Sequence, residues 1–236
     1  MMGKSFQDWC VNTLVHILSN RKNYGITTRD KGFRYAVDAI VKHYAGMYHC
    51  SDRSVTKEGR TCVNLWWDEM SSNRRELMLK SVIMSKKARE IVHLNPSLRA
   101  NELKGLLHWE HVLPCAKVLD ELCSLKEVGI ESVQRCFRHN RLVLITKDES
   151  RYLDGKAARF ENKDLEFVGQ HWPDERDAAQ KSLGDRPLKG GTALLRIAKL
   201  QNNGVVFCTY DDGAELAPKS LLSYLNSSRR ELGSHQ

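Results

Sequence analysis

The sequence lacks several features that would assign it to a specialised class of protein. No uninterrupted apolar run approaches the ~20 residues that a membrane-spanning helix needs. The first residues carry neither the continuous apolar segment nor the small-residue cleavage site of a signal peptide. Only 5 prolines and 15 glycines occur among 236 residues, which argues against long disordered or collagen-like stretches. We therefore expect a globular cytoplasmic protein with no membrane association.

The number and spacing of the cysteines argue against two kinds of structural site. There are 7 of them, an odd number, widely spaced along the chain and without a C-x-x-C pair. This pattern excludes a disulfide framework and a four-cysteine zinc site as expectations. It fits a reducing compartment, where free thiols persist.

Charge is unevenly distributed along the chain, whose formal net charge is +8. Residues 1–107 contain 18 Lys/Arg and 10 Asp/Glu, whereas residues 108–186 contain 13 and 15. A basic half beside a slightly acidic middle is what a phosphate-binding surface next to a carboxylate site would produce. A solvated basic face explains the same numbers equally well.

The N-terminal half shows helical spacing of its apolar residues. The pattern predicts helices over residues 5–18 and 30–46, a polar loop over 46–64, and a long basic helix over 72–94. The second of these is the clearest, because Asp30 is well placed as its N-cap.

The second half of the chain mixes signals for helices and strands. A short helix is expected after Pro114, an apolar strand over 141–145, and then a helix that opens with a Thr146–Glu149 capping box. Near the C-terminus an Asn-Gly pair between two apolar runs predicts a β-hairpin at 201–204, followed by a short helix. The fold class expected is α+β.

Several residues able to do acid–base or metal chemistry gather between positions 108 and 149. They are His108, Glu110, His111, His139, Asn140, Asp148 and Glu149. A zinc protease is excluded because its H-E-x-x-H motif is absent. A zinc nucleobase deaminase is excluded because the second cysteine of its P-C-x-x-C motif is replaced by Val118.

A third interpretation is a phosphodiesterase that uses one metal ion. Its chemistry needs a base to activate water and a cation on the scissile phosphate. A neutral histidine is a suitable base near neutral pH, and carboxylate or amide oxygens suit Mg²⁺ or Mn²⁺. The adjacent Glu110 and His111, followed by Pro114, offer both kinds of group.

These residues resemble the HNH nucleases. The resemblance covers roughly residues 108–160: an acid–histidine pair at 110–111 with Pro114, then Asn140 leading an apolar strand, then Thr146 and an acidic helix start. It implies a ββα-metal finger as the nuclease core. The departures are an acidic residue where the helix ligand is usually His or Asn, and the 28 residues between His111 and Asn140.

Carried over by position, the resemblance gives each residue a role. His111 would be the general base, and Asn140 would orient it or its loop. Glu110 would be one metal ligand and Glu149 the second, with Asp148 as its substitute. Glu149 has an equally good alternative role as the acid of its capping box, and Asn140 is also suited to a turn.

The sequence therefore predicts an α+β protein in three regions: a helical basic region at 1–99 suited to DNA, a ββα-metal core at 100–186, and a tail at 187–236. The function expected is Mg²⁺- or Mn²⁺-dependent cleavage of double-stranded DNA, as in restriction or defence, with a homodimer as one way to cut both strands. The alternatives are a non-catalytic DNA-binding protein on the same scaffold and an RNA nuclease. The residues expected to contact the DNA backbone are Arg74, Arg75, Lys80, Lys86, Lys87, Arg89, Arg138 and Arg141.

Overall fold

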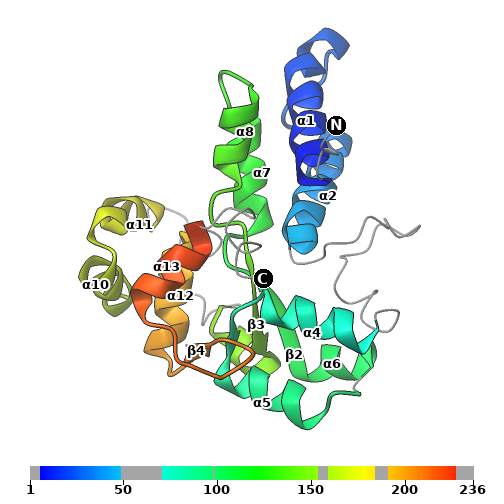
Figure 1. Cartoon of the computed structure of the whole chain (residues 1–236). Helices are drawn as coiled ribbons and strands as arrows, with labels where there is room; N and C mark the ends of the chain where they lie inside the picture. The colour runs from blue at the N-terminus through cyan, green and yellow to red at the C-terminus, as the bar shows by residue number, and fades with distance from the viewer. Residues whose placement is uncertain (1–5, 49–70, 98, 154–158, 184–190, 227–236) are drawn as a thin grey trace.

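A computed structural model describes residues 6–48, 71–97, 99–153, 159–183 and 191–226. In this part of the chain the protein is mixed α and β, mostly helical, with one small sheet (Figure 1). None of the described helices is both long and apolar enough to cross a membrane. The expected fold class is thus confirmed at the level of α+β.

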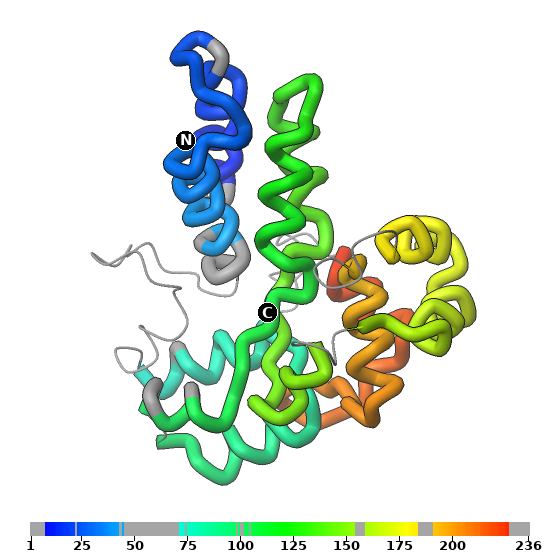
Figure 2. Tube along the Cα trace, turned by 180° about the vertical axis from the view of Figure 1, so that it is seen from behind, coloured from blue at the N-terminus to red at the C-terminus, as the bar shows by residue number. Residues whose placement is uncertain are grey.

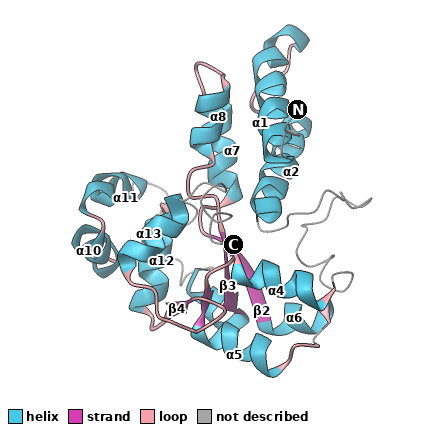
Figure 3. Cartoon of the chain, in the orientation of Figure 1, coloured by secondary structure: helices cyan, strands magenta, loops and turns pink. Residues whose placement is uncertain are grey.

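The helices follow one another around a few short strands (Figure 3). The helices are α1 (Phe6–Asn20), α2 (Lys31–Tyr48), α4 (Ser72–Lys80), α5 (Lys86–Leu94), α6 (Ala100–Leu106), α7 (Cys115–Ser124), α8 (Ile130–Cys136), α9 (Lys147–Ser150), α10 (Asn162–His171), α11 (Arg176–Ser182), α12 (Ala193–Asn202) and α13 (Pro218–Asn226). Short 3₁₀ turns are η1 (Arg21–Tyr24), η2 (Arg151–Leu153) and η4 (Pro173–Glu175).

The sheet draws its strands from three distant parts of the chain. Its order is β2 (Leu107–His111), β3 (Leu142–Thr146), β1 (Met84–Ser85) and β4 (Phe207–Cys208). β2 and β3 are antiparallel, β1 is parallel to β3, and β4 is antiparallel to β1. Each of the three expected regions therefore contributes to the same sheet.

β3 is buried on both faces, which explains its continuous apolar sequence. Val143 and Ile145 face the larger core cluster, which includes α12 and the helices α1, α2, α7 and α8. Leu142 and Leu144 face a smaller cluster formed with α4, α5 and α6. The sheet thus separates two layers of helices.

The two N-terminal helices are confirmed and pack against an insertion in the sheet. Helices α7 and α8 lie between β2 and β3 in sequence, and they stand beside α1 and α2 (Figures 1 and 2). Phe33, Val37 and Val41 bury one face of α2 in the larger cluster. The polar loop expected over 46–64 falls mostly outside the described residues.

The single long helix expected over 72–94 is wrong. The chain instead forms α4, leaves the helix at Ser81, passes through β1 and starts α5. Met84 is fully buried between β3 and β4, where it pairs with Leu144 and Cys208. The hydroxyl of Ser85 accepts a hydrogen bond from the Ala88 amide and caps α5.

The β-hairpin expected at 201–204 is also wrong, because its first arm is α12. Thr192 caps that helix at its start. At its end Gly204 has φ +82°, the Gly204 amide donates to the Gln201 carbonyl, and the Val205 amide donates to the Leu200 carbonyl. These bonds form a Schellman motif, so the Asn-Gly pair ends a helix here. The helices expected after Pro114 and near the C-terminus are confirmed as α7 and α13.

Candidate functional site

The predicted site residues lie on one pair of strands and the helix after it. β2 and β3 pair from Leu107–Thr146 at one end to His111–Leu142 at the other. Helix α9 follows β3 directly. The chain therefore runs strand, helical insertion, strand, short helix, and His111 and Asn140 both lie at the end where the insertion leaves and returns.

Glu110 is buried in an ion-paired cluster on one face of β2. Its Oε1 accepts a hydrogen bond from Arg196 on α12, and its Oε2 accepts one from His108 Nε2 at 3.0 Å. Burial alone would raise the pKa of this carboxyl group, but the His108 hydrogen bond and the Arg196 charge outweigh it and hold the pKa below its usual value. Glu110 is therefore an ionised carboxylate whose two oxygens are both occupied.

His111 points to the opposite face of β2, since neighbouring side chains on a strand alternate. His111 is partly exposed as a residue, whereas its Nδ1 is buried and has no hydrogen-bond partner among the described residues. Burial lowers the pKa of His111 to about 4. The carboxylate charge of Glu110 opposes this shift, while the positive charges of Lys42 and Arg196 act with it. The imidazole is therefore neutral at pH 7.

Asn140 lies in a tight turn just before β3. It is 1% exposed, and neither its Oδ1 nor its Nδ2 has a hydrogen-bond partner among the described residues. His139, next to it, adopts φ +64°, and the Arg141 amide donates to the His139 carbonyl at 2.8 Å. A non-glycine residue in this conformation is uncommon and is held by its surroundings.

Asn226, at the end of α13, holds this turn in place. Its Oδ1 accepts from Arg138 Nε at 3.2 Å and lies 2.7 Å from His139 Nε2. The guanidinium Nε can only donate, so the Asn226 atom must be the oxygen, and His139 Nε2 must carry a proton. Two hydrogen bonds thus join the C-terminal helix to the residues before Asn140.

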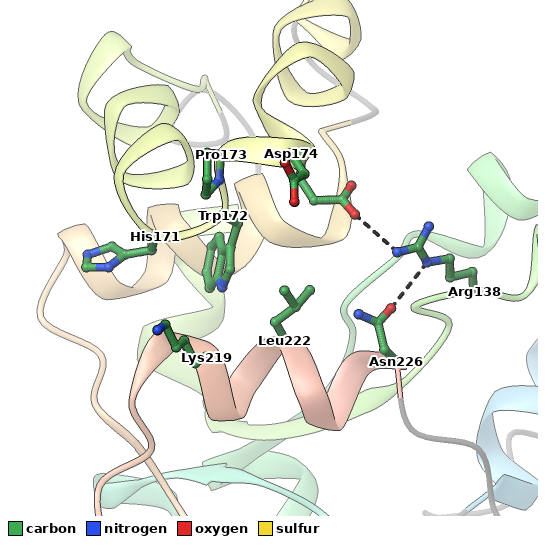
Figure 4. A pocket seen from close by; sticks show the side chains of 9 residues that line it. Arg138, His171, Trp172, Pro173, Asp174, Lys219, Leu222 and Asn226 are labelled. Atoms are coloured by element: carbon green, nitrogen blue, oxygen red, sulfur yellow. Dashed lines mark hydrogen bonds and ion pairs between the residues drawn. The ribbon is translucent and has the colours of Figure 1, made fainter.

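A pocket of about 390 Å³ opens beside the turn (Figure 4). Arg138 and Asn226 line one end, Lys219 and His171 the other, and Trp172 and Leu222 the middle. Arg138 also pairs with Glu175 at 3.2 Å, and the indole of Trp172 donates to the Pro218 carbonyl. The Arg138 guanidinium and the Trp172 indole therefore already have hydrogen-bond partners within the fold.

The structure places Glu149 away from Glu110. Glu110 pairs with Val143, three residues along β3 from Thr146, a separation of ~10 Å at ~3.3 Å per residue, and Glu149 lies beyond the Thr146 end of the strand. Its Oε2 accepts from the Thr146 amide at 2.8 Å and from the Ser85 hydroxyl at 2.6 Å. The capping box expected from the sequence is confirmed, with Ser85 as a further partner. Asp148 is exposed and pairs with Arg151.

The described residues do not fit the expected Mg²⁺ or Mn²⁺ site. Glu110 is neutralised by Arg196, and Glu149 caps its own helix. Within the described ranges no group of three or more His, Cys, Asp or Glu side chains is placed to hold a metal ion. A cation at Glu110 would need Arg196 to leave the carboxylate first.

Three of the six expected DNA-binding residues of α4 and α5 face an acidic loop at residues 209–215. Lys80 pairs with Glu76 and Asp211, and Lys86 pairs with Glu215. Arg89 donates to the carbonyl oxygens of Tyr210 and Asp211. A Cβ on Gly213 would come within 2.9 Å of the Arg89 side chain, so loop and helix are closely packed.

The other predicted DNA contacts differ in accessibility. Lys87 is exposed and Arg75 is half-buried, while the side chain of Arg74 lies outside the description. Arg141 is 7% exposed, and burial lowers its pKa to about 10. A residue so buried is poorly placed to contact a phosphate.

Arg196 and Lys42, two cations whose charges act on His111, could not be predicted from the sequence. Arg196 lies 86 positions from its partner Glu110, and no local pattern links the two. Lys42 belongs to an ordinary exposed helix face, and only the packing of α2 on the insertion brings it near His111.

Searches against family models, curated proteins and solved structures find no match for this chain.

Proposed function

We propose that this chain is an HNH-type DNA endonuclease in which His111 is the general base. The observation that carries the proposal is the placement of a neutral, partly exposed His111 and a buried Asn140 at the same end of a strand–strand–helix unit. Both residues keep buried polar atoms that have no hydrogen-bond partner in the described part of the chain, which is costly in a purely structural site.

The proposed chemistry is hydrolysis of a phosphodiester bond. His111 accepts a proton from a water molecule, the water oxygen attacks the phosphorus, and the bond to the 3′ oxygen breaks. The 3′ oxygen leaves as a hydroxyl group after taking a proton from solvent water, and the product carries a 5′ phosphate. The approach of a phosphate anion raises the pKa of His111 from its low value, toward the range in which a base works near neutral pH. Asn140 supports the turn that faces His111.

A second candidate is a DNA-binding protein without catalytic activity. Two observations favour it: the carboxylate of Glu110 is neutralised by Arg196, and Glu149 is fully used as a helix cap. A scaffold that retains these contacts would bind nucleic acid and leave the phosphodiester bond intact.

Incubation of purified protein with supercoiled plasmid separates the two candidates. Parallel reactions contain Mg²⁺, Mn²⁺ or EDTA, and each is repeated with His111→Ala. Nicking or linear product that disappears in the variant supports the nuclease. DNA binding with no cleavage under any of these conditions supports the binding protein and overturns the enzyme.

A further inference from the structure

Helix α2 presents a polar face that points away from the core. Lys31, Tyr35, Asp38 and Lys42 are spaced four, three and four residues apart, so they lie on one side of the helix. The buried Phe33, Val37 and Val41 occupy the opposite side. We call Lys31, Tyr35, Asp38 and Lys42 the outer face of α2.

The side chains on and near the outer face of α2 are well exposed. Tyr35 is 78% exposed, and the Lys42 side chain is 46% exposed. Tyr24, in the turn before the helix, is 75% exposed. Residues 21–44 contain six Lys/Arg and two Asp, a net charge of +4. Exposed tyrosines among basic residues are typical of surfaces that bind nucleic acid.

The C-terminal end of α2 lies against the candidate site. The rings of Tyr44 and Phe137 stack with their centroids 4.0 Å apart, and Phe137 directly precedes the turn that carries Asn140. Lys42 is close enough to His111 for its charge to lower the pKa of the imidazole. Arg34 pairs with Asp120 at 2.5 Å and fixes the helix on the insertion. The outer face therefore leads toward His111.

We propose that the outer face of α2 is the surface on which duplex DNA docks, with Lys42 contacting the phosphate nearest His111. This inference rests on the proposed nuclease function. From Lys31 to Lys42 the helix rises ~16 Å at 1.5 Å per residue, which spans about five base-pair steps of ~3.4 Å. Lys31 and Lys42 neutralise phosphates, and the Tyr35 hydroxyl donates to the backbone between them.

The ion pair that holds Lys42 within the fold is weaker than the contacts that hold the basic residues of α4 and α5, so Lys42 is released more easily to bind DNA. Asp38 pairs with Lys42 in an exposed i,i+4 contact, a type worth only ~0.3–0.5 kcal/mol. Arg89 on α5, by contrast, is held by two backbone carbonyls, and its neighbours Lys80 and Lys86 face acidic residues of the same loop. A DNA backbone thus displaces little when it reaches α2.

The test measures DNA binding in EDTA, so that it does not depend on cleavage. A labelled 30-base-pair duplex, which is ~100 Å long and so about six times the length of the ~16 Å face, is titrated at several salt concentrations. The variants are Lys31→Ala/Lys42→Ala and Tyr35→Ala. Lys181→Ala, an exposed lysine on α11, is the control for loss of one positive charge.

Loss of two phosphate contacts reduces the slope of log K against log salt by about 1.8. Between 50 and 200 mM salt the double variant should therefore lose ~12-fold less affinity than the wild type does. Tyr35→Ala should weaken binding with little change in slope, and Lys181→Ala should change neither. Because the substituted side chains are exposed, a thermal melt should show all variants folded.

The outcomes separate this inference from the function on which it rests. If the wild type binds no DNA, the proposed function fails and the docking surface with it. If the wild type binds or cleaves DNA and the double variant keeps the full salt slope, the docking surface alone is overturned. A reduced slope in Lys87→Ala with an unchanged slope in the double variant would place the contact on α5 instead.

Discussion

The guanidinium of Arg196 on α12 forms an ion pair with the carboxylate of Glu110 on β2. The side chains are 13% and 12% exposed, respectively. The pair joins the C-terminal helices to the strand that carries His111. It also decides the chemistry of Glu110, because a carboxylate held by an arginine is not free to bind a metal ion.

Replacing Arg196 by methionine should strongly destabilise the fold. The change leaves a buried carboxylate without its main partner, and breaking a buried pair in this way costs about 3–5 kcal/mol. It should also raise the pKa of Glu110, because the favourable charge is lost. Urea unfolding measures the loss, and Arg196→Met/Glu110→Gln should recover much of it. A cost below ~1 kcal/mol for Arg196→Met would show that the pair is not held as described.

The low pKa of His111 predicts a loss of stability in mild acid. The folded-state pKa is about 4, whereas an unperturbed histidine has a pKa of ~6.5. Between these values the unfolded chain binds a proton that the folded chain does not. The contribution of His111 to the free energy of unfolding is therefore fully present above about pH 6.5. As the pH falls toward 4, this contribution decreases by up to ~1.4 kcal/mol per pH unit.

Urea unfolding of the wild type and His111→Gln at several pH values tests this relation. The variant should lose the part of the pH dependence that the imidazole supplies. His16→Gln, which changes an exposed histidine on α1, should keep it. Identical pH profiles for the wild type and His111→Gln would show that His111 is not buried in the neutral form.

Two substitutions at Glu149 distinguish a cap from a metal ligand. Glu149→Ala removes the acceptor for the Thr146 amide and the Ser85 hydroxyl, and should cost about 1–2 kcal/mol of unfolding free energy. Glu149→Gln keeps an oxygen for these bonds and should retain most of the stability and the rate of DNA cleavage. A rate that collapses in Glu149→Gln while stability is kept would instead support the metal-ligand role.

Local patterns in the sequence predicted much of the secondary structure correctly. The apolar spacing of α2, the capping box at Thr146 and the apolar run of β3 each depend on neighbouring residues only. The two errors arise where tertiary contacts override the local signal. Met84 leaves the helical pattern because it completes the sheet, and the Asn-Gly pair ends a helix that is buried nearly all round.

Less of the candidate site could be predicted from the sequence. The position of His111 and Asn140 at one end of the strand pair follows from the expected order of elements. The partners of Glu110 and the approach of Lys42 depend on α12 and α2, which are far from the site in sequence. Pairings of this kind carry no spacing signal, so only the folded arrangement reveals them.

The most direct test of the central claim compares cleavage and binding in the same preparations of wild type and His111→Ala. His16→Ala serves as the matched control. The account predicts that His111→Ala lowers the rate of plasmid cleavage by about 10²–10⁴-fold and leaves the Kd for duplex DNA and the salt slope unchanged. Cleavage by His111→Ala at the wild-type rate would contradict the assignment of His111 as the base.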